Sequence, residues 1–149
     1  MDMIERELTI AAPVERVWAL ITAGEHLGRW FADAGADVDL RPGGGLELRW
    51  KEHGTSRGRI EAVEPPRRLA FRWAPFKEPG GVEPTDANST LVEFTLHAEG
   101  EGTRLRVVES GFESLDCSDE QRDQNRDGNT EGWRLELGEL QEYALTVAV

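Results

Sequence analysis

The sequence has very little cysteine, no long apolar run and no basic leader. Its one cysteine, Cys117, excludes an internal disulfide. No stretch approaches the roughly 20 apolar residues that cross a bilayer, which argues against a membrane-spanning protein. The segment from Met1 to Arg6 lacks the basic start and apolar stretch of a signal peptide. Together these absences predict a cytoplasmic protein.

Positive charge is also scarce. Lysine and arginine together number 17 against 29 aspartates and glutamates, so the formal net charge is −12 at pH 7. A charge of this sign and size repels phosphate backbones and anionic lipid surfaces. We therefore expect neither a nucleic acid nor a membrane as a partner.

Motifs of several catalytic classes are missing as well. The chain contains no Gly-x-Ser-x-Gly, Walker or dinucleotide-binding sequence. Its three histidines, His26, His53 and His97, have no partner at metal-ligand spacing. The run Gly43-Gly44-Gly45 is typical of a hairpin turn, because the lysine and helix of a phosphate-binding loop do not follow it. We expect no cofactor.

The order of the hydrophobic periodicities is the main positive signal. A half-buried strand is predicted from Ile4 to Ile10, and two short helices around Val14 to Ile21 and Glu25 to Phe31. Six strand-like segments follow between Val38 and Glu109, and an amphipathic helix begins near Gly132-Trp133. A single long helix after an antiparallel meander has one economical place to go, across the concave face of the sheet.

The predicted fold class is therefore α+β, of the helix-grip type. A curved antiparallel sheet of about seven strands wraps round a long C-terminal helix, with two short helices after the first strand. Residues 1–149 are expected to form one such domain, because their number suits a single core.

Two segments are predicted to be irregular. Residues 74–88 are rich in proline and glycine and indicate a long loop. The polar residues 113–130 predict a solvated loop before the last helix. Within it, Asp123, Asn125 and Asp127 match the first ligands of an EF-hand calcium loop. Arg134 stands where that loop needs its bidentate glutamate, so a solvated loop is preferred over a metal site.

Glu109 is the one candidate for chemistry. By alternation it shares a face with Leu105 and Val107, which directs it toward the interior. A carboxylate in an apolar cavity has a raised pKa and can bind a polar ligand group or move a proton. The alternative is that the strand frays there and Glu109 reaches solvent or pairs with an arginine.

Large side chains on the predicted inward faces indicate a cavity suited to a flat apolar ligand. The residues expected to line it are Leu48, Trp50, Ile60, Phe71, Trp73, Phe94, Leu96, Val107, Glu109, Trp133, Leu137 and Leu140.

An ordered set of motifs along nearly the whole chain resembles one known family. These motifs are Ala12-Pro13-Val14-Glu15-Arg16-Val17-Trp18 with Trp30-Phe31, Arg41-Pro42-Gly43-Gly44, Gly58-Arg59-Ile60 with Glu64-Pro65-Pro66-Arg67-Arg68-Leu69, Gly102-Thr103-Arg104-Leu105 with Glu109-Ser110-Gly111-Phe112, and Gly132-Trp133 with Leu137, Leu140 and Tyr143. The set resembles the proteins similar to the activator of the heat-shock protein 90 ATPase, in the START-like, birch-pollen-allergen-like (SRPBCC) superfamily. The resemblance implies a helix-grip domain with a deep cavity between the last helix and the sheet. It also implies a wide range of functions, since the superfamily includes lipid and sterol carriers, polyketide cyclases, hormone receptors and chaperone activators.

The function expected first is that of a cytoplasmic protein that binds a small hydrophobic or aromatic ligand in the grip cavity. Two alternatives stay open. One is a co-chaperone or stress-related interaction module whose partner is a chaperone or a stress regulator. The other is a cyclase- or hydrolase-type enzyme that uses Glu109. The chain is expected to be a monomer or a homodimer.

Overall fold

The computed structural model describes residues 3–52, 54–74 and 82–146. The order of the elements is β1 (Met3–Ile10), α1 (Val14–Thr22), α2 (Gly24–Trp30), β2 (Gly35–Val38), β3 (Gly45–Trp50), β4 (Gly54–Glu64), β5 (Arg68–Trp73), β6 (Thr90–Glu99), β7 (Gly102–Ser110), the 3₁₀ turn η1 (Phe112–Ser114) and α3 (Asp119–Thr146). His53 and residues 75–81 of the predicted loop lie outside the described residues. Among the described residues, no helix combines the length and the apolar character needed to cross a bilayer.

The strands form one antiparallel sheet in the order β1-β7-β6-β5-β4-β3-β2. Strands β2 to β7 follow one another as a meander, and β1 pairs with the last strand of that meander. The inward faces are set by alternation, as in β3, where Leu46, Leu48 and Trp50 are buried between partly exposed neighbours. This confirms the predicted α+β helix-grip fold with seven strands.

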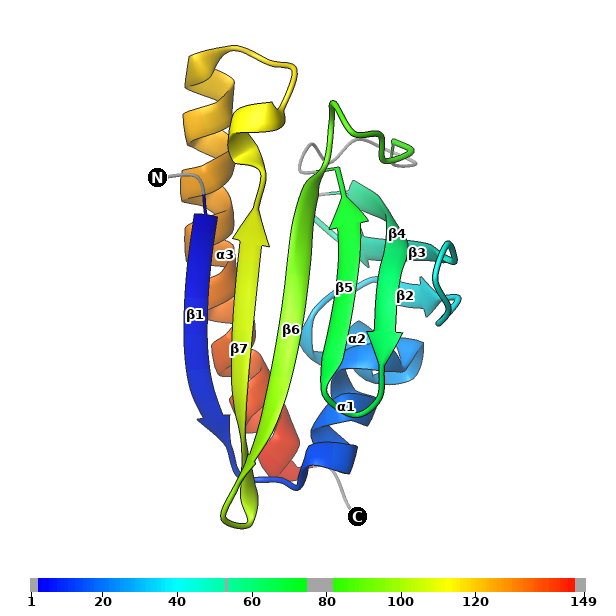
Figure 1. Ribbon diagram of the computed structural model, residues 1–149, viewed down its shortest axis with the longest axis vertical. Helices are drawn as coiled ribbons and strands as arrows, with labels where there is room; N and C mark the ends of the chain where they lie inside the picture. The colour runs from blue at the N-terminus through cyan, green and yellow to red at the C-terminus, as the bar shows by residue number, and fades with distance from the viewer. Residues whose placement is uncertain (1–2, 53, 75–81, 147–149) are drawn as a thin grey trace.

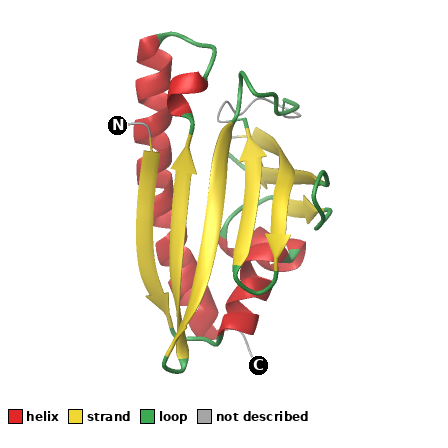
Figure 2. Cartoon of the chain, viewed as in Figure 1, coloured by secondary structure: helices red, strands yellow, loops and turns green. Residues whose placement is uncertain are grey.

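The helices α1, α2 and α3 all lie on one face of the curved sheet (Figure 2). Long α3 runs beside β1, and its first turns project beyond the end of that strand (Figure 1). The side chains that α3 buries are Trp133, Leu137, Leu140 and Ala144, all in its C-terminal half. Only that half is therefore held by the apolar core.

The start of α3 differs from the prediction, because the helix begins at Asp119 instead of near Gly132. Ser118 and Gln121 form a capping box: the Gln121 backbone N–H donates to Ser118 Oγ at 3.1 Å, and the Ser118 N–H donates to the Gln121 side chain at 3.3 Å. Ion pairs three residues apart, such as Asp119–Arg122, support the following turns. Arg122 also donates to the carbonyl of Phe112.

The predicted solvated loop with its calcium-like motif is therefore wrong, since residues 119–130 are helical. On a helix, Asn125 is rotated about 200° from Asp123, so the three oxygen side chains of the motif do not converge. Asp123 instead forms an ion pair with Arg126 at 3.0 Å. Nowhere in the described part of the chain do three His, Cys, Asp or Glu side chains gather as a metal site.

Candidate functional site

A cavity of about 450 Å³ lies between the middle of α3, residues 128–136, and the last residues of β3 and β5. Its size falls within the roughly 300–1,000 Å³ of small-molecule sites. We call it the aromatic cavity. The residues that line it are Phe31, Asp33, Trp50, Glu52, Trp73, Gly128, Asn129, Glu131, Gly132, Trp133, Leu135 and Glu136.

Four packed rings form the floor of the aromatic cavity. The Phe31 ring stacks on Trp133 with centroids 5.5 Å apart and on Trp73 at 5.9 Å, and it meets Trp50 edge-on at 5.3 Å. Each of the four side chains is at most 9% exposed. Since every ring is held by another ring, the floor exists before any ligand arrives.

Glu109 of β7 lies among the residues of this floor with its side chain fully buried. Its Oε1 accepts from Trp133 Nε1 at 2.8 Å, and its Oε2 accepts from Trp73 Nε1 at 2.8 Å. The Thr90 hydroxyl donates to Oε2 at 2.5 Å, and Asn129 Nδ2 lies 3.2 and 3.0 Å from Oε1 and Oε2. One carboxyl group therefore joins β5, β6, β7 and α3.

The position of Glu109 confirms that it points inward, and the fraying-strand alternative is wrong. However, Glu109 is absent from the lining of the aromatic cavity, whereas three of its donors, Trp73, Asn129 and Trp133, belong to that lining. Its direct contacts are with the cavity wall. In this structure Glu109 is a positioning residue.

Two opposing effects act on the Glu109 proton. Burial raises the pKa of this carboxyl above its ordinary value of 4.5, and the hydrogen bonds from Thr90, Trp73, Trp133 and Asn129 act in the lowering direction. Desolvation is the larger effect. The geometry accommodates a protonated carboxyl, because the hydroxyl of Thr90 is able to accept as well as donate.

The indole N–H groups of the floor all donate to protein acceptors. Trp73 and Trp133 donate to Glu109, and Trp50 Nε1 donates to the carbonyl of Phe31 at 2.8 Å. The side-chain amide of Asn129 is likewise engaged by Glu109. The lining thus presents apolar ring surface, and its aromatic donors are already satisfied.

Nine of the twelve residues predicted to line a cavity do not line the aromatic cavity. A second space, between the sheet and α2, holds only about 10 Å³ and is bordered by Leu48, Ile60, Phe71 and Phe94 among others. That volume is about the minimum for one water molecule. Leu96, Val107, Glu109, Leu137 and Leu140 are buried and line neither space. Of the predicted set, Trp50, Trp73 and Trp133 line the aromatic cavity.

Two glycines of α3, Gly128 and Gly132, lie one helical turn apart above the cavity. A Cβ built on either one meets no atom within 4 Å, so packing does not demand glycine there. Each costs the helix about 1 kcal/mol relative to alanine. The missing side chains leave open space on the helix face that borders the cavity.

The rim of the aromatic cavity carries four carboxylates, on Asp33, Glu52, Glu131 and Glu136. Glu131 pairs with Arg134, and Asp33 accepts the backbone N–H of Lys51 at 2.8 Å. Among the residues that the structure describes, no cationic side chain lies within ion-pair distance of Asp33 or Glu52, and none lines the cavity. The rim is therefore a region of negative charge.

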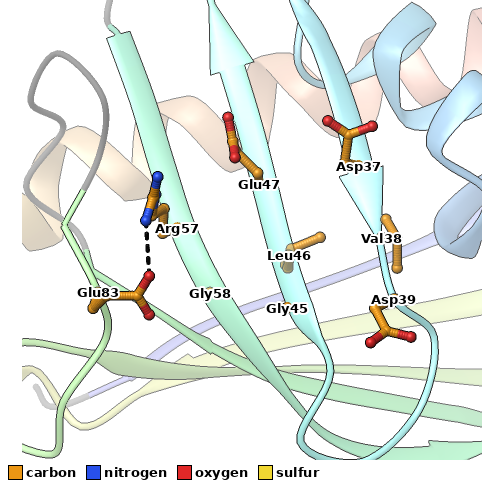
Figure 3. Close-up of a pocket in the computed structure, with 9 residues that line it drawn as sticks. All are labelled: Asp37, Val38, Asp39, Gly45, Leu46, Glu47, Arg57, Gly58 and Glu83. Carbon is orange, nitrogen blue, oxygen red and sulfur yellow. Dashed lines mark hydrogen bonds and ion pairs between the residues drawn. The ribbon is translucent and has the colours of Figure 1, made fainter.

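A separate open groove lies beside β2, β3 and β4 (Figure 3). It also carries four acids, but each is paired with arginine. Asp37 and Glu47 pair with Arg49, Asp39 pairs with Arg41, and Glu83 pairs with Arg57. No aromatic residue lines this outer groove among the described residues. Three arginines thus pair with its four acids.

Comparisons with known proteins agree with this architecture. The family model described as Activator of Hsp90 ATPase homolog 1-like protein matches residues 11–144. No functionally curated protein matches the chain.

Three similar solved structures place the chain among proteins of one fold. MLL2253 from Mesorhizobium loti is 22% identical with a TM-score of 0.77, and the match covers 99% of both chains. DynU16, from the dynemicin biosynthetic locus, is 23% identical with a TM-score of 0.74; the match covers 98% of this chain but only 48% of DynU16, so this chain spans about half of that protein. The Aha1 dimer from Colwellia psychrerythraea is 18% identical with a TM-score of 0.71, and 95% of each chain is covered.

Proposed function

The chain belongs to the Activator of Hsp90 ATPase homolog 1-like family, and from this premise we propose that it is a cytoplasmic protein that binds a small molecule with an apolar or aromatic body in the aromatic cavity. One observation carries the proposal: a cavity of about 450 Å³ stands open above a floor of four preformed aromatic rings. Elsewhere between helices and sheet the described core is closely packed, so this cavity is where a ligand has room.

Support also comes from how the cavity is kept open. Gly128 and Gly132 weaken α3 and are not required by packing, yet they border the cavity. DynU16, a protein of the dynemicin biosynthetic locus, has a similar fold.

An enzymatic role for Glu109 receives less support than binding. All its contacts are with protein donors, and its side chain is fully buried beside the floor. A proton transfer to a ligand needs hydrogen-bond reach of the reacting atom. Binding needs no such reach, and the aromatic floor supplies what binding requires.

The test is a tryptophan-fluorescence titration and a thermal unfolding series with neutral, cationic and anionic aromatic compounds. Three of the five tryptophans lie in the floor, so occupancy changes their emission. A ligand at a hundred times its Kd is expected to add about 2.7 kcal/mol to the unfolding free energy. The absence of a saturable response from every compound would overturn the proposal.

A matched pair of variants locates the site. Gly132→Leu places a side chain in the cavity, whereas Gly138→Leu makes the same change on an exposed position of α3 that does not line it. Both replace a poor helix former by a good one, so both are expected to fold. We expect Gly132→Leu to abolish the ligand response and Gly138→Leu to keep it. An equal response in the two variants would place binding elsewhere.

A chaperone partner is the second candidate, and membership of the family is the observation that favours it. It predicts that the protein raises the ATPase rate of a heat-shock protein 90 chaperone from the same cell, with Gly132→Leu as active as the unaltered protein. An unchanged ATPase rate over a saturating range of the protein would exclude this candidate.

A further inference from the structure

We propose that the ligand of the aromatic cavity is a small organic cation, an amine or quaternary ammonium group attached to an apolar body. This rests on the proposed function, namely that the aromatic cavity is a binding site. Three observations support it: the donors of the floor, the charge of the rim and, within the described residues, the absence of a metal-binding cluster.

The floor has its hydrogen-bond donors turned away from a ligand. The N–H groups of Trp73 and Trp133 are held by Glu109, and that of Trp50 by a backbone carbonyl. An anionic or carbonyl-bearing ligand needs hydrogen-bond donors, and these three N–H groups are not available to it because each already donates to a protein acceptor. A cation needs none of them, because indole rings attract it through their π-electrons.

The rim supplies the acceptors that a cation does need. Asp33 and Glu52 stand at the mouth with no cationic side chain in ion-pair distance among the described residues, whereas the nearby Glu131 is paired with Arg134. The outer groove provides the contrast, since each of its four acids lies in an ion pair with one of three arginines. A cation entering the aromatic cavity meets opposite charge at the rim and apolar ring surface below it.

The combination favours an organic cation over a metal ion. Within the described residues, no three His, Cys, Asp or Glu side chains gather closely enough to hold a metal. The floor of the site is aromatic, and a hydrated metal ion gains nothing from such a floor. An ammonium group with an apolar body uses the rim and the floor together.

The experiment compares three probes that share a 2-naphthylmethyl body and differ in the attached group: trimethylammonium, hydroxyl and carboxylate. Kd is measured by isothermal calorimetry at low and high salt. The cation is expected to bind at least tenfold more tightly than the neutral probe, which corresponds to about 1.4 kcal/mol. We expect the anion to bind more weakly still, and the preference for the cation to shrink at high salt.

Two double variants distinguish the effect of the rim carboxylates on binding from the effect of the protein's overall charge. Asp33→Asn with Glu52→Gln removes two rim charges, and Asp39→Asn with Glu83→Gln removes two charges from the outer groove. Only the first pair is expected to reduce the cation preference. An equal reduction by both pairs would overturn the inference.

The outcomes also distinguish this inference from the proposed function. Equal Kd values for cation and neutral probe, both lost in Gly132→Leu, would overturn the inference and leave the binding site standing. No binding by any probe, including the compounds of the wider series, would remove both.

Discussion

Replacing Glu109 by glutamine tests the buried network on which the aromatic floor depends. Each carboxyl oxygen of Glu109 accepts one indole N–H, from Trp133 on Oε1 and from Trp73 on Oε2. Glutamine offers one oxygen and one NH₂ group. An indole N–H only donates, so in either orientation of the amide one tryptophan faces another donor.

The size of the effect follows from that mismatch. A buried donor without an acceptor costs about 1–3 kcal/mol. Glu109→Gln is therefore expected to lower the unfolding free energy by about that amount, or Tm by about 2–4 °C for each kcal/mol in a protein of this size. The double variant with Trp73→Phe removes one of the two donors, so its loss should be smaller than the sum of the two single losses.

The loss of stability in Glu109→Gln depends on pH, and the burial of Glu109 determines the direction of this dependence. Burial raises the pKa of Glu109 above its ordinary 4.5, so the folded protein binds this proton more tightly than the unfolded chain does. The stability that this contributes is fully present below the unfolded pKa and is lost as pH rises through the folded pKa. Glutamine has no titrating proton, so the stability of the Glu109→Gln variant has no pH-dependent contribution from this position.

The advantage of the unaltered protein over Glu109→Gln should therefore be largest at acid pH and narrow as pH rises. It narrows by about 1.4 kcal/mol for each unit between the folded and unfolded pKa values. Urea unfolding of both proteins from about pH 4 to about pH 9 measures this difference, in which all other titrating groups cancel. If the difference in unfolding free energy stays constant with pH, the pKa of Glu109 is not raised. If the difference grows as pH rises, the hydrogen bonds lower the pKa more than burial raises it.

Three further changes test other parts of the fold by urea or thermal unfolding. Gly58→Ala places a Cβ 2.6 Å from the Arg72 carbonyl oxygen of the paired strand, and we expect a loss of about 1–3 kcal/mol from the forced shift. Trp30→Phe removes the 2.8 Å hydrogen bond from the buried indole to the Leu20 carbonyl, which is expected to cost about 1–3 kcal/mol; an unchanged Tm would contradict this. Ser118→Ala deletes the cap of α3 and should cost about 0.5–2 kcal/mol, with a loss of helical circular dichroism that Ser118→Asp restores.

The sheet was predictable from the sequence because its signal is local. Leu46, Leu48 and Trp50 alternate with polar residues, and such a period-two pattern survives without knowledge of the partner strands. The polar half of α3 was not found by the same reasoning. Before Trp133 it buries no side chain, so no apolar stripe marks it.

Other signals in the sequence do mark that half of the helix. Ser118 and Gln121 have the spacing of a capping box, and Asp119 with Arg122 has the spacing of a helical ion pair. The resemblance of residues 123–128 to a calcium loop obscured these signals. Asn129 could be placed beside Glu109 only once the helix was known to extend over the end of the sheet.

The extent of the cavity was beyond pattern reasoning for a different physical reason. Strand alternation correctly tells that Leu96 and Val107 point inward, and the helical period does the same for Leu137. Neither pattern tells whether the inward side chains leave space, which depends on how volumes fit across elements distant in sequence. Among the described residues, they nearly fill the space between the sheet and α2, and they leave room above Phe31 and the three tryptophans.

The two halves of α3 therefore have different structural roles. The C-terminal half closes the core with Leu137, Leu140 and Ala144. The N-terminal half contributes Gly128, Gly132 and Glu131 to the cavity, and polar contacts join it to η1 and to the sheet. Glu109 lies where the halves meet, and it holds Asn129 and Trp133 of the helix together with Trp73 of the sheet. The same carboxyl group holds both the cavity wall and the middle of α3 in place. A ligand bound against Trp73 and Trp133 is therefore expected to stabilise α3 as well as the cavity.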